Sequence, residues 1–317
     1  MFNRSIIFDT NAYRDLTKDK DFSTCKDDIL KIRLKEEEKQ INVYISPVVL
    51  MELFAHLSDI SDPHYQNCKH AVAAAYLHST LKDSEDYKIL ADPESLLVKL
   101  MFNQELPEHK EDCQYLGTLA YNIYKNPDEG FINTFRDNFK PIREHVRQSE
   151  LNFITTIYFS VIQQNNPNAN DWDGIKKEKQ LRKKFLKRIN SDSFLLEGAK
   201  SQVLKACLSA GIDPKTINDW EDRAKTILDI LPAPLYLYRE IMRRIAISGL
   251  DLSKVKKKRG NWIWDIQILH NCAKNSTFNN QEALLITSDS EMIDAANEAG
   301  LNDKILRLED YLALLNS

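Results

Sequence analysis

Short, uninterrupted apolar runs near both ends of the chain give the first expectation about its fold. The runs at Ser5 to Phe8 (SIIF) and Ala283 to Thr287 (ALLIT) have the length of strands and no polar face, so they predict strands that are buried on both sides. Val43 to Ile45 and Ile305 to Leu308 predict two further strands. Helical patterns separate these runs, and strands that alternate with helices predict an α/β fold with a parallel sheet and right-handed crossovers.

Helix start and stop signals lie between the predicted strands. Ser46-Pro47 predicts the start of a helix that runs to about Leu57, because proline is tolerated in a first turn whose N–H groups have no partner. Gly300 predicts the end of a helix that starts near Ser290. The other helices expected in the terminal parts of the chain are Lys26 to Gln40, Trp262 to Lys274 and a short helix after the last strand.

The middle of the chain, from about residue 60 to residue 255, has a different pattern. Long amphipathic stretches predominate, β-like alternation is almost absent, and no repeat of fixed period is present. Asp92-Pro93, Pro141 and Pro232 predict helix starts, whereas 165–174 and 211–214 are rich in turn residues and predict breaks. We therefore expect residues 61–254 to form a helical insertion in an α/β domain built from residues 1–60 and 255–317.

Composition limits the class of protein. The chain has 317 residues, of which 43% are hydrophobic, enough for two domains or for one domain with a large insertion. The five cysteines are scattered and have no CxxC spacing, which favours free thiols over disulfides or a zinc site. No signal peptide and no run of about 18 apolar residues is present, so we expect a cytoplasmic protein without a membrane anchor. The net charge of -4 argues against a uniformly basic nucleic-acid surface.

Acidic residues follow two of the predicted buried strands. Asp9 comes directly after Phe8, and Asp289 follows Thr287 by two positions. In parallel sheets, ligands bind beyond the carboxyl ends of the strands, so both carboxylates are expected at the same edge of the sheet.

Two more carboxylates, Glu52 and Asp265, interrupt helices that are otherwise apolar. An unpaired buried carboxylate is strongly unfavourable, and four carboxylates in one place repel one another. A divalent cation removes this conflict. Oxygen ligands suit Mg²⁺ or Mn²⁺, which retain waters that can serve as the nucleophile in a hydrolysis.

Four segments, in this order, resemble the acidic motifs of PIN-domain nucleases: IIFDTNAYRDL, YISPVVLMELFAHL, WDIQILHNCA and LLITSDSEMIDAA. The resemblance implies a three-layer α/β/α fold with a central parallel sheet, and metal-dependent hydrolysis of phosphodiester bonds, in RNA rather than DNA. The residues to which it assigns coordination of Mg²⁺ or Mn²⁺ are Asp9, Glu52, Asp265 and Asp289. It gives Asn11 and Thr287 an orienting role, and Glu291 resembles a further acidic metal-binding position of some members.

This resemblance covers about a third of the chain. Compact PIN-domain proteins have a far shorter connection than the one between Glu52 and Asp265 in this chain. The resemblance therefore leaves the substrate and the role of the helical insertion open.

Each of the four carboxylates also has an ordinary structural interpretation. Asp9 and Asp289 precede helices and would be suitable N-caps. Glu52 and Asp265 would be suitable partners for lysine or arginine. Both interpretations stay open. The metal site is excluded only if all four carboxylates serve as helix caps or ion-pair partners.

Two basic segments are candidates for contact with phosphate groups. The segment Lys254 to Arg259 precedes the helix of Asp265; a solvated linker is its alternative role. The substrate-binding residues predicted there are Lys256, Lys257, Lys258 and Arg259. Lys176 to Arg188 predicts a helix with one apolar stripe and a basic face that is either solvated or binds RNA.

The tryptophans and histidines near the acidic segments give no strong indication of a functional role. Trp262 and Trp264 either stack on bases or pack in the core, and core packing is the stronger expectation. His56 and His270 are expected to be ordinary packed or surface residues, because no zinc spacing is present.

Other enzyme classes lack their sequence motifs in this chain, whereas a non-catalytic protein with the same fold stays an alternative. An aspartyl phosphatase usually has a second Asp two positions after the first, where this chain has Asn11. The motifs GxxxxGK[ST] and GxGxxG are absent. A catalytically silent PIN-like scaffold that binds RNA or protein is the main alternative. An inhibitory protein partner, as toxin-like ribonucleases have, is a further expectation from the resemblance, although this chain is longer than that compact kind.

Overall fold

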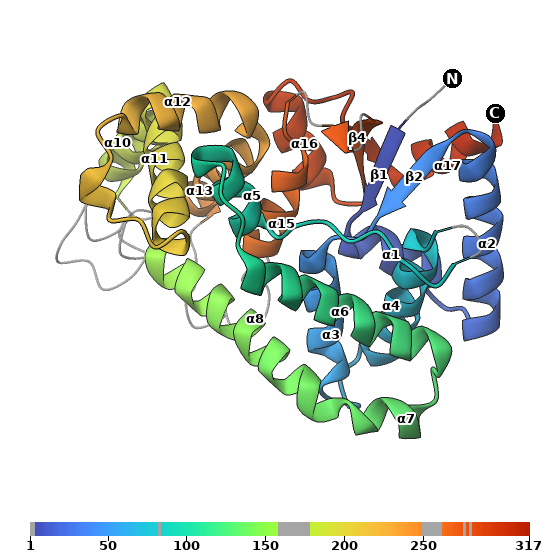
Figure 1. The fold of residues 1–317 in the computed structure, drawn as a ribbon. Helices are drawn as coiled ribbons and strands as arrows, with labels where there is room; N and C mark the ends of the chain where they lie inside the picture. Colours follow the sequence, from blue (N-terminus) through green and yellow to red (C-terminus); the bar gives the residue numbers. More distant parts are fainter. Residues whose placement is uncertain (1–3, 82–83, 158–177, 249–261, 275–276, 279–280) are drawn as a thin grey trace.

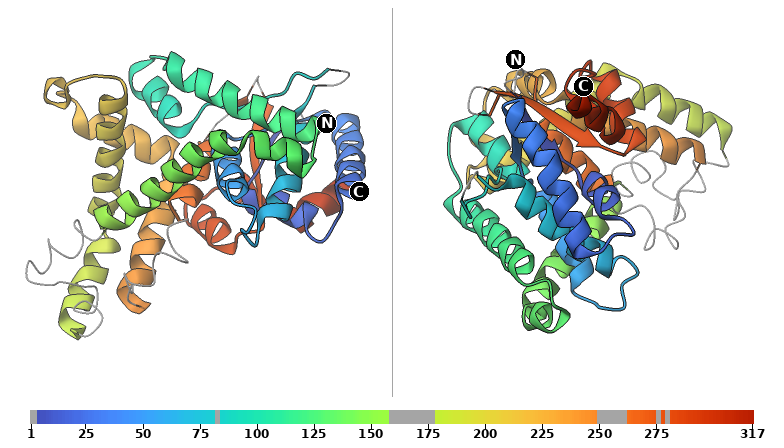
Figure 2. Two further views of the ribbon diagram at one scale, coloured as in Figure 1. Left: turned by 90° about the horizontal axis from the view of Figure 1, so that it is seen from below. Right: turned by 90° about the vertical axis from the view of Figure 1, so that its right-hand side faces the viewer.

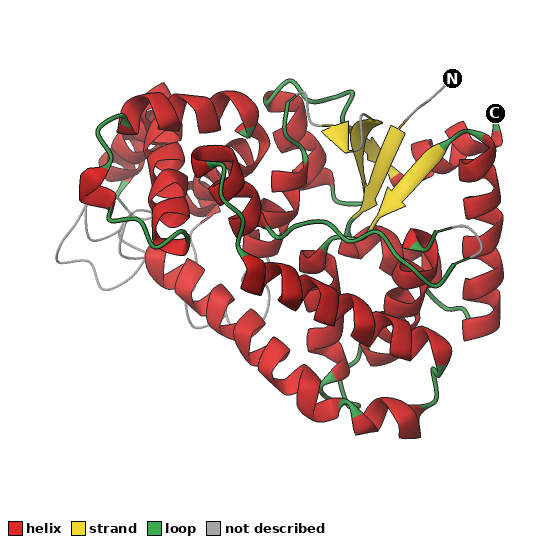
Figure 3. Ribbon diagram, viewed as in Figure 1, coloured by secondary structure: helices red, strands yellow, loops and turns green. Residues whose placement is uncertain are grey.

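The computed structural model describes residues 4–81, 84–157, 178–248, 262–274, 277–278 and 281–317. In this part of the chain, helices predominate and surround one small sheet (Figure 3). The chain is therefore an α/β protein with a large helical component, as the alternating apolar runs predicted.

The sheet contains four parallel strands and one short antiparallel strand within the described residues. The parallel strands, in the spatial order β2-β1-β4-β5, are β1 (Arg4–Phe8), β2 (Ile41–Tyr44), β4 (Gln281–Thr287) and β5 (Ile305–Arg307). All four confirm predicted strands. The sequence pattern does not predict β3 (Thr277–Phe278), which pairs with the start of β4, because two residues are too few to show a period.

The two ends of the chain meet in the centre of this sheet. β1 pairs with β4 in parallel register, with Ile7 opposite Leu285 and Phe8 opposite Ile286. The backbone N–H of Asp9 extends the pairing by donating to the carbonyl of Ile286 at 3.0 Å. Figure 1 shows the two strands side by side although they come from opposite ends of the sequence. Their carboxyl ends therefore open at the same edge of the sheet.

One face of the sheet carries Phe8. Its ring centroid lies 4.7 Å from that of His78, 5.3 Å from that of Tyr13 and 5.5 Å from that of Tyr311. The helices that pack around this face are α1 (Thr10–Thr17), α2 (Phe22–Glu38), α4 (Tyr65–Ser79) and α17 (Leu308–Asn316). The expected helix at Lys26 to Gln40 is α2, which starts earlier because Asp21 caps it.

A buried polar network attaches the C-terminal helix α17 to α2 and α4. The hydroxyl of Tyr311 donates to Glu36 Oε1 at 2.6 Å, and Glu36 Oε2 pairs with His78 Nε2 at 2.8 Å. The three side chains are each at most 3% exposed. Because a buried carboxylate without donors is strongly unfavourable, these bonds make the position of α17 specific.

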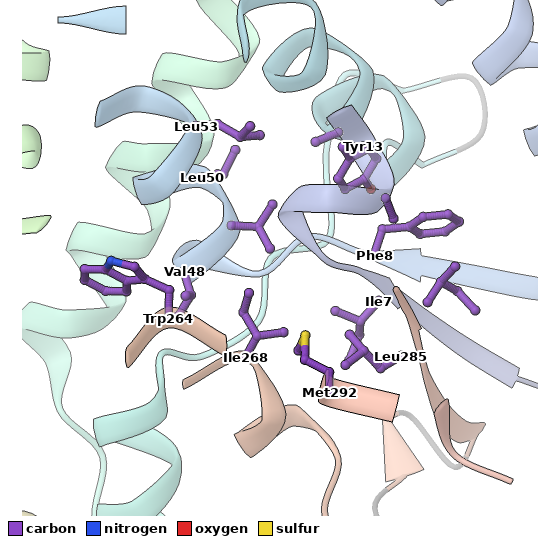
Figure 4. Packing of buried hydrophobic residues seen from close by; sticks show 14 of the residues in the cluster. Ile7, Phe8, Tyr13, Val48, Leu50, Leu53, Trp264, Ile268, Leu285 and Met292 are labelled. Atoms are coloured by element: carbon purple, nitrogen blue, oxygen red, sulfur yellow. The ribbon is translucent and has the colours of Figure 1, made fainter. Parts of the chain in front are cut away.

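The opposite face carries Ile7 and Leu285, which lie near Met292 of α16 (Ser290–Glu298) (Figure 4). Gly300 follows this helix with a φ of +71°, a conformation that favours glycine, and so ends it as predicted.

Two further helices continue this apolar core beyond α16. Pro47 starts α3 (Pro47–Leu57) as predicted. α15 (Trp262–Ile268) is shorter than expected and continues as a 3₁₀ turn to Asn271. Figure 4 shows Val48 of α3 beside Trp264 of α15, with Ile268 between Val48 and Met292. Helices α3, α15 and α16 thus share one core with the sheet.

The described part of the middle segment is almost entirely helical. Its remaining helices are α5 (Pro93–Phe102), α6 (Pro107–Lys125), α7 (Glu129–Thr134), α8 (Arg136–Ile157), α10 (Lys179–Ile189), α11 (Asp192–Ser209), α12 (Trp220–Ile230) and α13 (Pro232–Ser248). Pro93 and Pro232 start helices as predicted. The prediction for Pro141 is wrong: this proline lies inside α8, which begins five residues earlier. The expected break at 165–174 lies outside the described residues.

These helices pack in two groups. α4, α6, α8, α10 and α13 contribute to the main hydrophobic core, which they share with the sheet. α5, α11 and α12 enclose a second, smaller core. In Figure 1 and Figure 2, α10 to α13 lie on the far side of the molecule from α2 and α17. The domain boundaries near residues 60 and 255 stay a prediction.

All five cysteines are buried and unpaired. Among the described helices, none combines the length and the apolar character needed to cross a membrane.

Candidate acidic site

Asp9 lies at the carboxyl end of β1 and is only 1% exposed. It caps α1, since its Oδ1 accepts from the backbone N–H of Ala12 at 2.6 Å. Its Oδ2 accepts from the hydroxyl of Thr287. Phe8 of β1 pairs with Ile286 of β4, and Asp9 and Thr287 are the next residues along these parallel strands. Their side chains therefore project to the same face of the sheet. The register of β1 and β4 therefore creates this contact.

Thr287 joins the two strand ends. It is fully buried; while its hydroxyl donates to Asp9, the same oxygen accepts from the backbone N–H of Asp289 at 2.8 Å. The loop that carries Asp289 is thus fixed relative to the carboxylate of Asp9.

Asp289 caps α16. Its Oδ1 accepts from the backbone N–H groups of Glu291 at 2.6 Å and of Met292 at 3.2 Å. Among the described residues, no donor occupies its Oδ2. Both strand-end aspartates therefore have the capping role expected as the ordinary interpretation. In Asp289, capping still leaves one oxygen available.

Glu52 approaches from α3 and accepts a hydrogen bond from the hydroxyl of Thr10, the residue after Asp9. Burial raises the pKa of Glu52 to about 8, against the effect of the Thr10 hydrogen bond; the charges of Asp9 and Glu150 raise it further, and Arg14 lowers it. Glu52 is thus close enough to Asp9 for the two charges to oppose each other.

Asp265 enters from α15 and has the most unfavourable surroundings. Burial raises its pKa well above the ordinary value, and the neighbouring charges of Glu52, Asp289, Asp9 and Glu291 raise it further. No described residue donates a hydrogen bond to its carboxylate. The structure therefore brings the four predicted carboxylates, which come from four separate segments, into mutual electrostatic range.

The pKa of Asp9 is raised by the same surroundings. Burial raises its pKa to about 7, although the hydrogen bonds from Thr287 and Ala12 lower it and the charge of Asp289 raises it. No lysine or arginine in the described part of the chain forms an ion pair with Asp9, Glu52, Asp265 or Asp289. Within the described residues, the shared negative charge thus lacks a directly bound lysine or arginine.

Two predicted site residues lie at the edge of this group. Glu291 is close enough to raise the pKa of Asp265, but its Oε1 accepts from Arg244 of α13. Asn11 lies in the first turn of α1, and no hydrogen bond joins it to an acidic side chain among the described residues. Neither residue has the surroundings of the four central carboxylates.

The sequence gives no signal for one further acidic neighbour. Glu150 belongs to α8, far from the acidic segments in sequence, and accepts from Trp264 Nε1 at 3.2 Å. Burial raises its pKa, and its charge contributes to the raised pKa of Glu52. Only the packing of α8 against α3 and α15 brings it there.

The predicted phosphate-contacting residues Lys256, Lys257, Lys258 and Arg259 lie outside the described residues. The second basic segment forms the predicted helix in part, as α10, whose buried stripe includes Phe185 and Ile189. Trp264 is 1% exposed and packs in the core, which excludes base stacking by this residue in the described conformation.

The two histidines near the acidic segments have ordinary partners. His270 is buried, and His56 Nδ1 lies 3.0 Å from Asp62 Oδ2.

The chemistry of the donors fits a hard divalent cation, because the group consists of carboxylates whose charges oppose one another. In the described part of the chain, however, no three His, Cys, Asp or Glu side chains are grouped so that they could hold a metal ion. Mg²⁺ is commonly held by one or two carboxylates together with waters and substrate phosphates, so a closed protein cage is not required.

Comparisons of this chain with family models, with curated proteins and with solved structures give no match. The resemblance to PIN-domain nucleases therefore depends on the four acidic segments alone.

Proposed function

We propose that this chain is a metal-dependent endonuclease with a PIN-like α/β/α domain and that it hydrolyses phosphodiester bonds in RNA. The observation that carries the proposal is the convergence of Asp9, Glu52, Asp265 and Asp289 beside the carboxyl ends of β1 and β4. Desolvation raises the pKa of three of these carboxylates, and no described ion pair balances their charge. A divalent cation would relieve that repulsion.

In this proposal Asp9, Glu52, Asp265 and Asp289 hold Mg²⁺ or Mn²⁺. A cation held by these carboxylates would supply a water of lowered pKa and would neutralise charge on the phosphoryl oxygens. Thr287 orients Asp9, and Thr10 orients Glu52, through the hydrogen bonds that each hydroxyl donates. These bonds hold the carboxylates in place before substrate binds, which reduces the rearrangement needed for reaction.

A proton must leave the attacking water. A carboxylate oxygen of Asp265 is suited to accept it, because no described donor occupies this carboxylate and its pKa is raised. Glu291 is less suited, since Arg244 already donates to it. No covalent intermediate with the protein is required.

The choice of RNA comes from the resemblance and from the basic segments. α10 carries Lys and Arg residues outside its buried stripe, and Lys256 to Arg259 add four positive charges to the chain. Such groups bind the phosphates of a nucleic acid without reading its bases.

A catalytically silent scaffold is the second candidate. The observation in its favour is that Asp9 and Asp289 already cap helices, while no described group of three ligands is arranged to hold a metal. In such a protein the carboxylates would be structural, and RNA or protein binding would belong to other surfaces.

Cleavage of labelled RNA and DNA in Mg²⁺, in Mn²⁺ and in chelator separates the two candidates. We expect metal-dependent cleavage of RNA that is lost in Asp9→Asn and in Asp265→Asn. Asp222→Asn is the matched control, because it removes one charge from an exposed position on α12. Equal cleavage by all four proteins would reject the nuclease assignment, and absence of cleavage by the wild type on every substrate would favour the scaffold.

A further inference from the structure

A cavity of about 500 Å³ lies behind the helix that carries Asp265. The residues of this helix and its 3₁₀ extension that line it are Ile263, Ile266, Gln267 and His270. Successive helical residues are rotated by about 100°, so these four positions share one face, roughly opposite to Asp265. The other walls come from α5, α8, α11 and α13. The cavity is thus separate from the acidic site.

The size of the cavity suits a small molecule. Ligand pockets typically enclose about 300 to 1,000 Å³ and combine apolar walls with a few polar groups. The apolar walls here include Leu97, Leu235 and the rings of Phe153 and Tyr238. None of the four central carboxylates lines the cavity.

The polar lining is mostly uncharged. Its hydrogen-bonding groups include the side-chain amides of Asn152, Gln202 and Gln267. Among the described lining residues, Lys205 is the one cation, but its Nζ lies 2.8 Å from Glu94 Oε1, so its charge is already paired. The lining therefore favours an uncharged ligand that offers both donors and acceptors.

His270 adds a specific requirement. Its side chain is buried, with the residue only 4% exposed, and its Nδ1 lies 3.0 Å from the backbone carbonyl of Ile266. A carbonyl only accepts, so Nδ1 carries the proton and Nε2 is left as an acceptor. Burial lowers the pKa of His270 to about 4, which keeps the ring neutral. No described residue donates to Nε2, and this atom is not fully buried, so it can accept a hydrogen bond from water or from an N–H or O–H group of a ligand.

We propose that this cavity binds a nucleobase, supplied either by a free nucleoside or by an unpaired base of an RNA strand. A nucleobase is planar and uncharged, with apolar faces and an edge that alternates donors and acceptors. Aromatic and aliphatic walls match the faces, whereas the amides and His270 Nε2 match the edge. Only the RNA source rests on the proposed nuclease function; binding of a free nucleoside does not.

The test is a titration, in the presence of chelator, with adenosine, guanosine, cytidine and uridine and separately with short single-stranded oligoribonucleotides. Ser201→Trp fills the cavity from α11, and His270→Phe removes the acceptor while it keeps a planar ring. Leu204→Trp is the matched control, because it adds the same side chain to an exposed position of α11 outside the lining. Unfolding curves for each variant establish that it is folded.

We expect at least one nucleoside or oligoribonucleotide to bind. Ser201→Trp and His270→Phe should each weaken binding about tenfold or more, and Leu204→Trp less than about twofold. Binding of nucleosides identifies the free source, whereas binding of oligoribonucleotides alone identifies a base in a strand. The cavity lies apart from the acidic site, so binding of a nucleoside in chelator is expected whether or not the chain proves to be a nuclease. Absence of binding by every probe, or binding that Ser201→Trp leaves unchanged, would overturn the proposal.

Discussion

Replacing Asp9 by asparagine should stabilise the metal-free protein. The substitution preserves shape and the N-cap of α1, since asparagine caps helices as well as aspartate does. The amide Nδ2 would face Thr287, whose hydroxyl can accept a second hydrogen bond and turn its proton toward Met292 Sδ, 3.7 Å away. The change therefore removes a charge with little loss of hydrogen bonding.

The size of the effect follows from the pKa of Asp9. Burial raises this pKa from 3.8 to about 7, so the folded protein holds a proton that the unfolded chain releases. The ionised form then opposes folding: its cost is absent below about pH 3.8, grows as the pH rises, and is complete above about pH 7. At about 1.4 kcal/mol for each pH unit, the full cost is roughly 4 kcal/mol, of which roughly 2 to 3 kcal/mol develop between about pH 5 and pH 8.

Urea denaturation in chelator, repeated at several pH values, measures this difference. The stability of Asp9→Asn relative to the wild type should increase by roughly 2 to 3 kcal/mol between about pH 5 and pH 8, whereas Asp222→Asn should stay within about 0.5 kcal/mol of the wild type. Addition of Mn²⁺ should narrow this difference, because the metal stabilises the wild type more than the variant that binds it more weakly. Parallel pH profiles for wild type and Asp9→Asn in chelator would show that the ionised carboxylate of Asp9 does not oppose folding.

Three further results are expected. Binding of Mn²⁺ near pH 7 should release protons, because the raised pKa values of Asp9 and Glu52 leave these groups partly protonated before metal binds; calorimetry in two buffers of different ionisation enthalpy measures the release, and identical heats would contradict it. Charge reversal across Lys256 to Arg259 should weaken RNA binding and flatten its dependence on salt, and an unchanged slope would show that these residues do not contact phosphate. Tyr311→Phe should destabilise the protein by about 1 to 3 kcal/mol in urea denaturation, because buried Glu36 loses a donor; wild-type stability would show that this bond adds nothing.

The sequence predicts the parallel strands and the residues at their carboxyl ends. Runs without a polar face identify buried strands, and a polar residue that ends such a run marks a position at the sheet edge. The positions of Asp9 and Thr287 follow from this pattern together with the parallel pairing of β1 and β4. Pro47 and Gly300 mark helix ends because each has a local backbone requirement.

Other features depend on packing that no local pattern records. α1 is only eight residues long, too short for its period to stand out. Pro141 lies in the second turn of α8 rather than the first, because the helix start is set by residues before it. The contacts of Glu150 with Trp264 and of Glu291 with Arg244 join helices that are distant in sequence. These contacts decide which carboxylates remain available in the acidic site, and only the folded chain contains them.

Titration of the protein with Mn²⁺, followed by the electron paramagnetic resonance signal of the free ion, tests most directly whether the four carboxylates share a cation. Wild type and Asp222→Asn should bind Mn²⁺ with the same affinity. Asp9→Asn and Asp265→Asn should each bind about tenfold more weakly or worse, because each removes a ligand charge. Equal binding by all four proteins, or no binding by the wild type, would contradict a shared site.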